Sequence, residues 1–223
     1  NIYSLLGHVR YSTSKSKFVN EDNIQPFIGY NDVIGQFSIA HNGHIFMYEE
    51  RAKKLNIDLK DHETDSNLLL KFVEQYKFKR KYKKLKGYIL EIFMNMIKTF
   101  PGVFCVCLMD KEGTLYCTRD RFGVRPLSYT VDEQKCIISS ETCSFPQNVK
   151  KENIHHIRPA EIKIFKWNTD LKKFNINSHD CNLLTDIEDA HQNERFCFFE
   201  LIYFMNPKSI YKDEYVEEIR RKF

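Results

Sequence analysis

The stretch Pro101-Gly102-Val103-Phe104-Cys105-Val106-Cys107-Leu108-Met109 marks the point where the local pattern of the chain changes. Before it, apolar residues recur at helical spacing over residues 88–100, and the proline–glycine pair ends that pattern. After it comes an apolar run, which favours a buried strand. Cys105 and Cys107 alternate within this run, so we predict that they share one face of the strand and pack as small apolar side chains.

The elements predicted on the two sides of this stretch differ in kind. Upstream we predict helices at residues 48–55, 66–76 and 88–100, and a short apolar run at 37–40 that closes at the turn-forming dipeptide Asn42-Gly43. Downstream we predict strands at residues 115–118, 127–130, 137–139, 161–166 and 196–204, and a charged helix from near Asp213. The polar residues 166–193 are expected to form a loop. Clustered antiparallel strands with helices grouped elsewhere indicate an α+β layered fold.

The composition is that of an ordinary folded protein. Of the 223 residues, 42% are hydrophobic and 29% are charged, a balance that excludes a disordered chain. Lys and Arg number 34 against 30 Asp and Glu, and a net charge of +4 is too small to indicate a nucleic-acid partner. No apolar run approaches the roughly 20 residues of a membrane helix, so we expect no membrane partner either. The chain has 7 cysteines and no Cys-x-x-Cys pair, which favours a reducing, cytoplasmic setting.

One basic segment allows two interpretations. Its basic residues are Lys77, Lys79, Arg80, Lys81, Lys83, Lys84 and Lys86, between two predicted helices. They would form an electrostatic patch for phosphate or nucleic acid, or a solvated surface loop. We favour the loop, because such runs are common on solvated surfaces.

Two polar clusters are suited to holding a carboxylate and an oxyanion. Arg10 stands between apolar neighbours and is followed by hydroxyls, among them Thr13. Its guanidinium group would bind a carboxylate bidentately, or form a structural ion pair at a strand end. Asn42 and Gly43 present a side-chain amide beside a glycine N–H, which suits a developing oxyanion; the alternative is a plain hairpin turn. We do not expect a metal at the neighbouring histidines, because catalytic zinc needs three protein ligands.

Two further clusters extend this argument. Asp65 stands where a helix is predicted to begin, so its carboxylate either caps free N–H groups or pairs with a ligand's ammonium group. Residues 119–127 alternate opposite charges around a glycine turn, for which we favour a structural salt-bridge network. Arg10, Asp65 and the Asn42-Gly43 pair together describe a pocket for an α-amino acid whose side chain is attacked.

Several motifs carry a resemblance to a known family. In order and spacing, the chain resembles the class II glutamine amidotransferase domain, an N-terminal-nucleophile hydrolase, at Gly7-His8-Val9-Arg10-Tyr11-Ser12-Thr13, Asn23-Ile24-Gln25-Pro26-Phe27, Ala40-His41-Asn42-Gly43, Thr64-Asp65-Ser66, residues 119–127 and Ser139-Ser140-Glu141. Within that class, residues 197–209 are similar to the segment that joins the two halves of the amidophosphoribosyltransferase family. The resemblance covers nearly the whole chain apart from the basic segment and residues 166–193.

The resemblance implies a fold and a reaction. The fold is a four-layer α/β/β/α sandwich, expected here without its first strands. A terminal cysteine attacks the side-chain amide of glutamine, releases ammonia and leaves a thioester that water hydrolyses. By position, Arg10 and Thr13 would bind the glutamine carboxylate and Asp65 its ammonium group, and Asn42 and Gly43 would form the oxyanion hole. Ammonia would then react with phosphoribosyl pyrophosphate to give 5-phosphoribosylamine, the first committed step of purine synthesis.

The same resemblance sets expectations for the chain as a whole. Residues 1–205 would be the glutaminase domain and residues 206–223 a linker and the start of a phosphoribosyltransferase half. The catalytic cysteine is missing from this sequence, so we expect a segment of a longer, homo-oligomeric enzyme that is inactive when isolated. We expect no cofactor in this segment, magnesium in the transferase half, and an iron–sulfur cluster as an option with Cys197 as a ligand. The alternatives are another class II amidotransferase, such as glucosamine-6-phosphate synthase or asparagine synthetase, or a catalytically silent binding domain.

Overall fold

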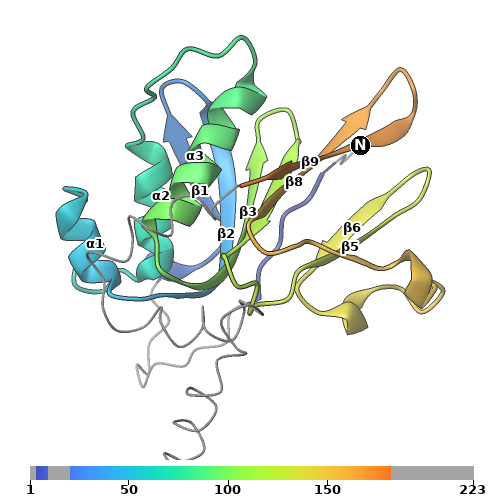
Figure 1. Cartoon of the computed structure of the whole chain (residues 1–223), viewed down its shortest axis with the longest axis horizontal. Coiled ribbons are helices and arrows are strands. Elements are labelled where there is room, and N and C mark those ends of the chain that lie inside the picture. The colour runs from blue at the N-terminus through green and yellow to red at the C-terminus, as the bar shows by residue number, and fades with distance from the viewer. Residues whose placement is uncertain (1–3, 10–20, 182–223) are drawn as a thin grey trace, which may run out of the picture. The chain divides into compact units, whose positions relative to one another are not determined.

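The computed structural model describes residues 4–9 and 21–181, shown in colour in Figure 1. In this part the α-helices are α1 (Tyr48–Lys54), α2 (Asp65–Glu74) and α3 (Leu85–Thr99), and short 3-10 helices cover Glu21–Asn23, Thr142–Ser144 and Lys151–Asn153. A 6-stranded sheet has the order β1 (Phe27–Asn31), β2 (Gly35–Ile45), β3 (Gly102–Asp110), β4 (Leu115–Arg119), β8 (Glu161–Asn168) and β9 (Lys173–Asp180). A 3-stranded sheet has the order β6 (Cys136–Ser139), β5 (Ser128–Val131) and β7 (His155–His156). Every strand pair is antiparallel, which confirms the predicted α+β class.

The described elements form three layers. Helices α2 and α3 lie side by side over one face of the 6-stranded sheet (Figure 1). Their apolar faces are buried there, and the ring of Phe93 in α3 lies 6.4 Å from that of Tyr116 in β4. The opposite face packs against the 3-stranded sheet through a buried cluster of Cys105, Cys117, Leu127, Tyr129, Ile157 and Phe165. The alternation of side chains in β3 therefore places Cys105 and Cys107 between the two sheets, on one face as predicted.

The predicted turn at Asn42-Gly43 is wrong, because β2 runs straight through this dipeptide. Its pairing with β3 continues past Gly43 to Ile45, which lies opposite Gly102. Gly43 has a φ of +146°, and a Cβ atom at this position would lie 2.1 Å from the carbonyl oxygen of Val103. Glycine is therefore needed here for a close approach of two strands and not for a chain reversal.

The predicted loop at residues 166–193 is also wrong over much of its described part. Strand β8 continues to Asn168, and β9 pairs with it along its whole length. Most side chains of β9 are exposed because it is an edge strand, so its sequence lacks the apolar alternation of a half-buried strand. The strand predicted at 196–204, the helix near Asp213 and the domain boundary after residue 205 lie outside the described residues.

The charged cluster at residues 119–127 has a structural role, but its bonds go mainly to the backbone. Arg119 donates to the carbonyl oxygens of Arg125 at 2.8 Å and of Ile157 at 2.7 Å. The carboxylate of Asp120 accepts the backbone N–H of Phe104 at 2.9 Å. These bonds hold the turn between β4 and β5 against β3.

The basic segment lies in solvent. All of its basic side chains are exposed, and Lys86 belongs to the first turn of α3. The segment is nevertheless attached to the fold, because the backbone N–H of Lys79 and the hydroxyl of Tyr76 both donate to Oε1 of the buried Glu91 at 3.2 Å. The surface position agrees with the loop interpretation.

Candidate functional site

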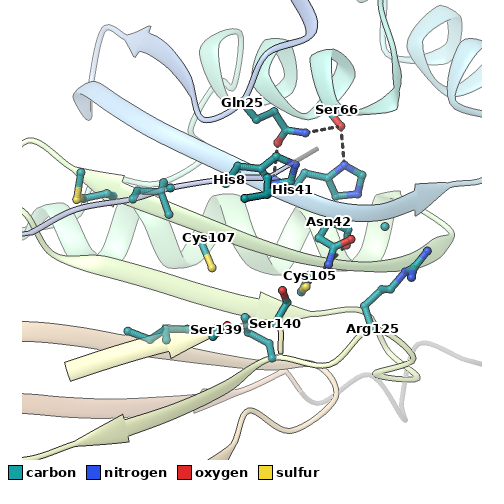
Figure 2. Close-up of a pocket in the computed structure, with 18 of the residues that line it drawn as sticks. His8, Gln25, His41, Asn42, Ser66, Cys105, Cys107, Arg125, Ser139 and Ser140 are labelled. Carbon is teal, nitrogen blue, oxygen red and sulfur yellow. Dashed lines mark hydrogen bonds between the residues drawn. The ribbon is translucent and has the colours of Figure 1, made fainter. Parts of the chain in front are cut away.

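A cleft of about 2500 Å³ opens between the two sheets. Asn42, Gly43 and Asp65, three of the predicted site residues, all line it. They come from the end of β2 and the start of α2, which Figure 2 shows at one side of the cleft. Arg10 and Thr13 lie outside the described residues, although their neighbour His8 lines the same cleft. Three of the five predicted binding residues are therefore brought together by the fold.

Asp65 does not act as a helix cap, which was one of the two roles that its position allowed. Thr64 occupies the N-cap position, and its backbone N–H is satisfied by Oδ1 of Asn67 at 2.8 Å. The carboxylate of Asp65 instead reaches across to β2, where Oδ2 accepts the backbone N–H of Ile45 at 2.9 Å. Nδ1 of His44 lies 3.4 Å from the same oxygen. Asp65 thus joins α2 to β2 at the edge of the cleft and places a negative charge there.

Asn42 lies on the face of β2 that looks toward the second sheet. Because side chains alternate along a strand, Asn42 points away from His41 and toward the side of Cys105 (Figure 2). The sulfur of Cys105 lies 3.7 Å from the carbonyl oxygen of Asn42. The side-chain amide of Asn42 and the neighbouring backbone of Gly43 therefore both border the cleft, as two hydrogen-bond donors to one oxygen would require.

On the other face of β2, a closed set of hydrogen bonds joins Gln25, His41 and Ser66 (Figure 2). The backbone N–H of His41 donates to Oε1 of Gln25 at 2.7 Å, and Nε2 of Gln25 donates to the hydroxyl of Ser66 at 3.2 Å. The same hydroxyl lies 2.8 Å from Nδ1 of His41. Neither Gln25 nor Ser66 was among the predicted site residues. The signal available in the sequence is Pro26 after Gln25, since proline cannot continue a strand ladder.

Burial controls the protonation of His41. The ring is only 4% exposed, and desolvation lowers its pKa to about 4, with the charge of Asp65 opposing the shift. The neighbouring His8, His44 and Arg125 add to the lowering. Nε2 of His41 has no hydrogen-bond partner among the described residues. His41 is therefore a neutral side chain at pH 7, held through its Nδ1.

The cleft also contains thiols, and that of Cys105 is a poor nucleophile. Burial raises the pKa of Cys105 to about 12, with the neighbouring Cys107 adding to the shift. The sulfur atoms of Cys107 and Cys117 lie 3.4 Å apart, and both thiols are free. Since the thiolate is the reactive form, the geometry gives Cys105 a packing role.

The described part of the chain offers no ready metal site or membrane span. No group of three or more His, Cys, Asp or Glu side chains within residues 4–9 and 21–181 is arranged to hold an ion. Cys197, the expected cluster ligand, lies outside these residues. In the same part of the chain, every helix is too short or too polar to cross a bilayer.

Known sequences resemble the chain over most of its length. A family model for a glutamine amidotransferase domain matches residues 8–147. The amidophosphoribosyltransferase of Methanocaldococcus jannaschii is 28% identical over 99% of this chain and 45% of its own length. A protein of the same archaeon assigned as a glutamine-hydrolyzing asparagine synthetase is 30% identical over 97% of this chain and 41% of its own. The chain thus spans less than half the length of these curated relatives.

A solved structure supports the fold. The glutamine phosphoribosylpyrophosphate amidotransferase of B. subtilis, solved as a complex with ADP and GMP, superposes with a TM-score of 0.57. It is 21% identical, and the match covers 79% of this chain and 34% of that one. This likeness confirms the predicted N-terminal-nucleophile hydrolase fold, of which the described residues supply one helical layer and both sheets.

Proposed function

The chain belongs to the glutamine amidotransferase domain family, and from this premise we propose that it is the glutaminase portion of an amidophosphoribosyltransferase. In that role it releases ammonia from glutamine, and the ammonia converts phosphoribosyl pyrophosphate to 5-phosphoribosylamine in the first committed step of purine synthesis. The observation that carries the proposal is the convergence of Asp65 with Asn42 and Gly43 at one cleft.

The proposed site binds glutamine through both ends of its amino-acid backbone. The carboxylate of Asp65, at the cleft edge, pairs with the ammonium group of the substrate. Arg10 and Thr13 bind the carboxylate group, a role that comes from the motif and not from the described residues. With both ends held, the side-chain amide is placed for attack, because bound reactants need no further search for orientation.

The proposed chemistry begins when a nucleophile attacks the side-chain amide. As the carbonyl carbon becomes tetrahedral, negative charge collects on its oxygen, and the amide of Asn42 and the N–H of Gly43 donate to it. Collapse of this intermediate releases ammonia and leaves an acyl-enzyme that water hydrolyses to glutamate. Burial raises the pKa of Cys105 and makes it unsuited to start this reaction, so Cys105 is not assigned as the nucleophile. The family resemblance implies a terminal cysteine in that role.

The partners and cofactors of the whole enzyme are part of the same proposal. Glutamine is the substrate of this portion and phosphoribosyl pyrophosphate that of the transferase half, where magnesium is expected. An iron–sulfur cluster with Cys197 as one of its ligands is an option that the family resemblance leaves open. A homo-oligomeric, cytoplasmic enzyme is the expected assembly.

A second candidate is another class II amidotransferase. The 30% identity with the asparagine synthetase relative favours it, since that protein shares the family domain over nearly all of this chain. Both candidates use the same glutamine site, so they differ in the acceptor of ammonia. Formation of pyrophosphate from phosphoribosyl pyrophosphate and glutamine by the full-length protein would distinguish the first candidate from the second.

The glutamine site itself is tested with Arg10→Ala in the full-length protein. The change is expected to raise the glutamine KM at least tenfold, because a charge-assisted bidentate contact is worth about 1.5–3 kcal/mol. The rate with ammonium salts in place of glutamine is expected to stay unchanged. Equal losses in the two rates would mean that Arg10 is structural, and wild-type protein that neither binds nor hydrolyses glutamine would contradict the proposed function.

A further inference from the structure

The ladder between β1 and β2 stops just before the residues assigned to the oxyanion hole. The last partners on this side are Phe27 and Ile39. Continuing the same antiparallel register by two residues would place Gln25 opposite His41. Pro26, between Gln25 and Phe27, has no N–H to give, so the backbone ladder ends here.

The side chain of Gln25 takes the place of the missing ladder bond. The backbone N–H of His41 can only donate, so its 2.7 Å partner on Gln25 is the amide oxygen, and this fixes the orientation of the amide. The NH₂ group then faces Ser66, to whose hydroxyl it donates at 3.2 Å. The hydroxyl of Ser66 also lies 2.8 Å from Nδ1 of His41, and the tautomer of the ring decides which of the two donates. Gln25 is 9% exposed and Ser66 is 8% exposed, so neither bond is in competition with bulk water.

Two side chains therefore hold the same edge of β2. In a strand, N–H groups two residues apart point to the same edge, so those of His41, Gly43 and Ile45 form one row. The first is bound by Gln25 and the last by Asp65. The N–H of Gly43 lies between them in the sequence. Asp65 and Ser66 are adjacent at the start of α2, so both attachments lead to one helical turn.

We propose that Gln25 is a positioning residue for the oxyanion hole. It sets the backbone immediately before Asn42 and Gly43 through its amide oxygen, and it connects that backbone to α2 through its NH₂ group. This inference rests on the proposed glutaminase function. Gln25 is expected to affect the reaction at the attacked amide group of glutamine. It is not expected to affect the binding of the ammonium and carboxylate groups of glutamine, which is the role of Asp65 and Arg10.

The test compares Gln25→Met, which keeps the length and removes both hydrogen bonds, with Gln25→Glu, which keeps an acceptor for the N–H of His41. In the full-length protein, Gln25→Met is expected to lower the glutamine-dependent kcat tenfold or more. This is less than the 10²- to 10³-fold loss typical of removing an oxyanion donor outright. The glutamine KM is expected to stay within threefold of the wild-type value, and Gln25→Glu is expected to recover at least a third of the wild-type kcat.

Two additional variants keep the result interpretable. Gln36→Met, at an exposed position of β2, is the matched control and is expected to behave as wild type. Ser66→Ala removes the second link alone and is expected to lower kcat by a smaller factor than Gln25→Met, again with KM unchanged. It also supplies the kinetic test should Gln25→Met not fold.

Three results would overturn the inference. They are a Gln25→Met or Ser66→Ala enzyme with wild-type kcat, a rise in KM that accounts for the whole loss, or equal losses in Gln25→Met and Gln25→Glu. A wild-type enzyme without glutamine binding or hydrolysis would instead contradict the proposed function. An active wild type with an equally active Gln25→Met would contradict the role of Gln25 alone.

Discussion

The backbone N–H of Ile45 donates a 2.9 Å hydrogen bond to Oδ2 of Asp65. Through this bond, a carboxylate assigned to substrate binding also fixes the end of the strand that carries Asn42 and Gly43. The same side chain thus has two functions that differ in their chemical requirement. The bond to Ile45 needs only an acceptor oxygen, whereas pairing with an ammonium group needs the negative charge.

Asp65→Asn separates these functions. The amide oxygen can still accept the N–H of Ile45, so we expect the thermal stability to change little. The glutamine KM should rise about 10- to 100-fold, since a hydrogen bond to a charged group contributes about 1.5–3 kcal/mol. Steady-state kinetics checks this, with Asp58→Asn at an exposed position as the control. An unchanged KM would remove Asp65 from the binding site.

Asn42→Ala tests the oxyanion hole. We expect a kcat lower by about 10²- to 10³-fold with little change in the glutamine KM, because the amide is used only when charge develops on the substrate oxygen. The measurement is glutamate release by the full-length protein, together with its ammonia-dependent rate. A parallel fall in the ammonia-dependent rate would indicate damage to the fold instead.

Gly43→Ala is expected to destabilise the fold by roughly 3 kcal/mol or more, because φ is +146° and the added Cβ would lie 2.1 Å from the oxygen of Val103. Urea unfolding measures this. Gly7→Ala is the control, since its Cβ would meet nothing within 4 Å, and a change of about 0.5 kcal/mol at most is expected there. Equal effects at the two glycines would contradict the close approach of β2 and β3.

The neutral, buried His41 makes stability depend on pH. Its pKa is lowered from 6.5 to about 4 in the folded protein, so between these values the unfolded chain binds a proton that the folded chain does not. The contribution of neutral His41 to the free energy of unfolding is fully present above pH 6.5. It is lost as the pH falls toward 4. For this one group the expected slope is about 1.4 kcal/mol per pH unit. Urea unfolding at several pH values should show this slope in wild type and in His179→Asn, whose site is exposed, but not in His41→Asn.

The sequence predicted local structure well where apolar periodicity was strong. The helices and most strands lie where the spacing placed them, because buried faces such as Leu68, Leu69 and Val73 of α2 have to repeat with the helix. No strand was predicted at β1, and two predictions were wrong, at Asn42-Gly43 and at β9. In the first, a turn-forming pair is used for a close strand contact, and in the second an edge strand is largely exposed and carries no apolar signal.

The candidate site was predictable in part. Motif resemblance identified Asn42, Gly43 and Asp65, and the fold brings them to one cleft. The roles of Gln25 and Ser66 were not predictable, because they depend on a side chain replacing a backbone bond between segments that lie 16 and 41 residues apart. Such a bond leaves no periodic trace in the sequence. The assignment of Arg10 and Thr13 stays a prediction.

The contacts at the start of α2 require a fixed number of residues in its first turn. Residues 65–67 each contact a different neighbour: Asp65 accepts from Ile45, Ser66 accepts from Gln25, and Asn67 donates to the carbonyl oxygen of Asp22. A helix turns by about 100° per residue. Adding or deleting one residue just after Thr64 would therefore rotate every one of these contacts away from its target at once. A change in the length of this turn is therefore expected to disturb the site more than an insertion among the exposed lysines after α2.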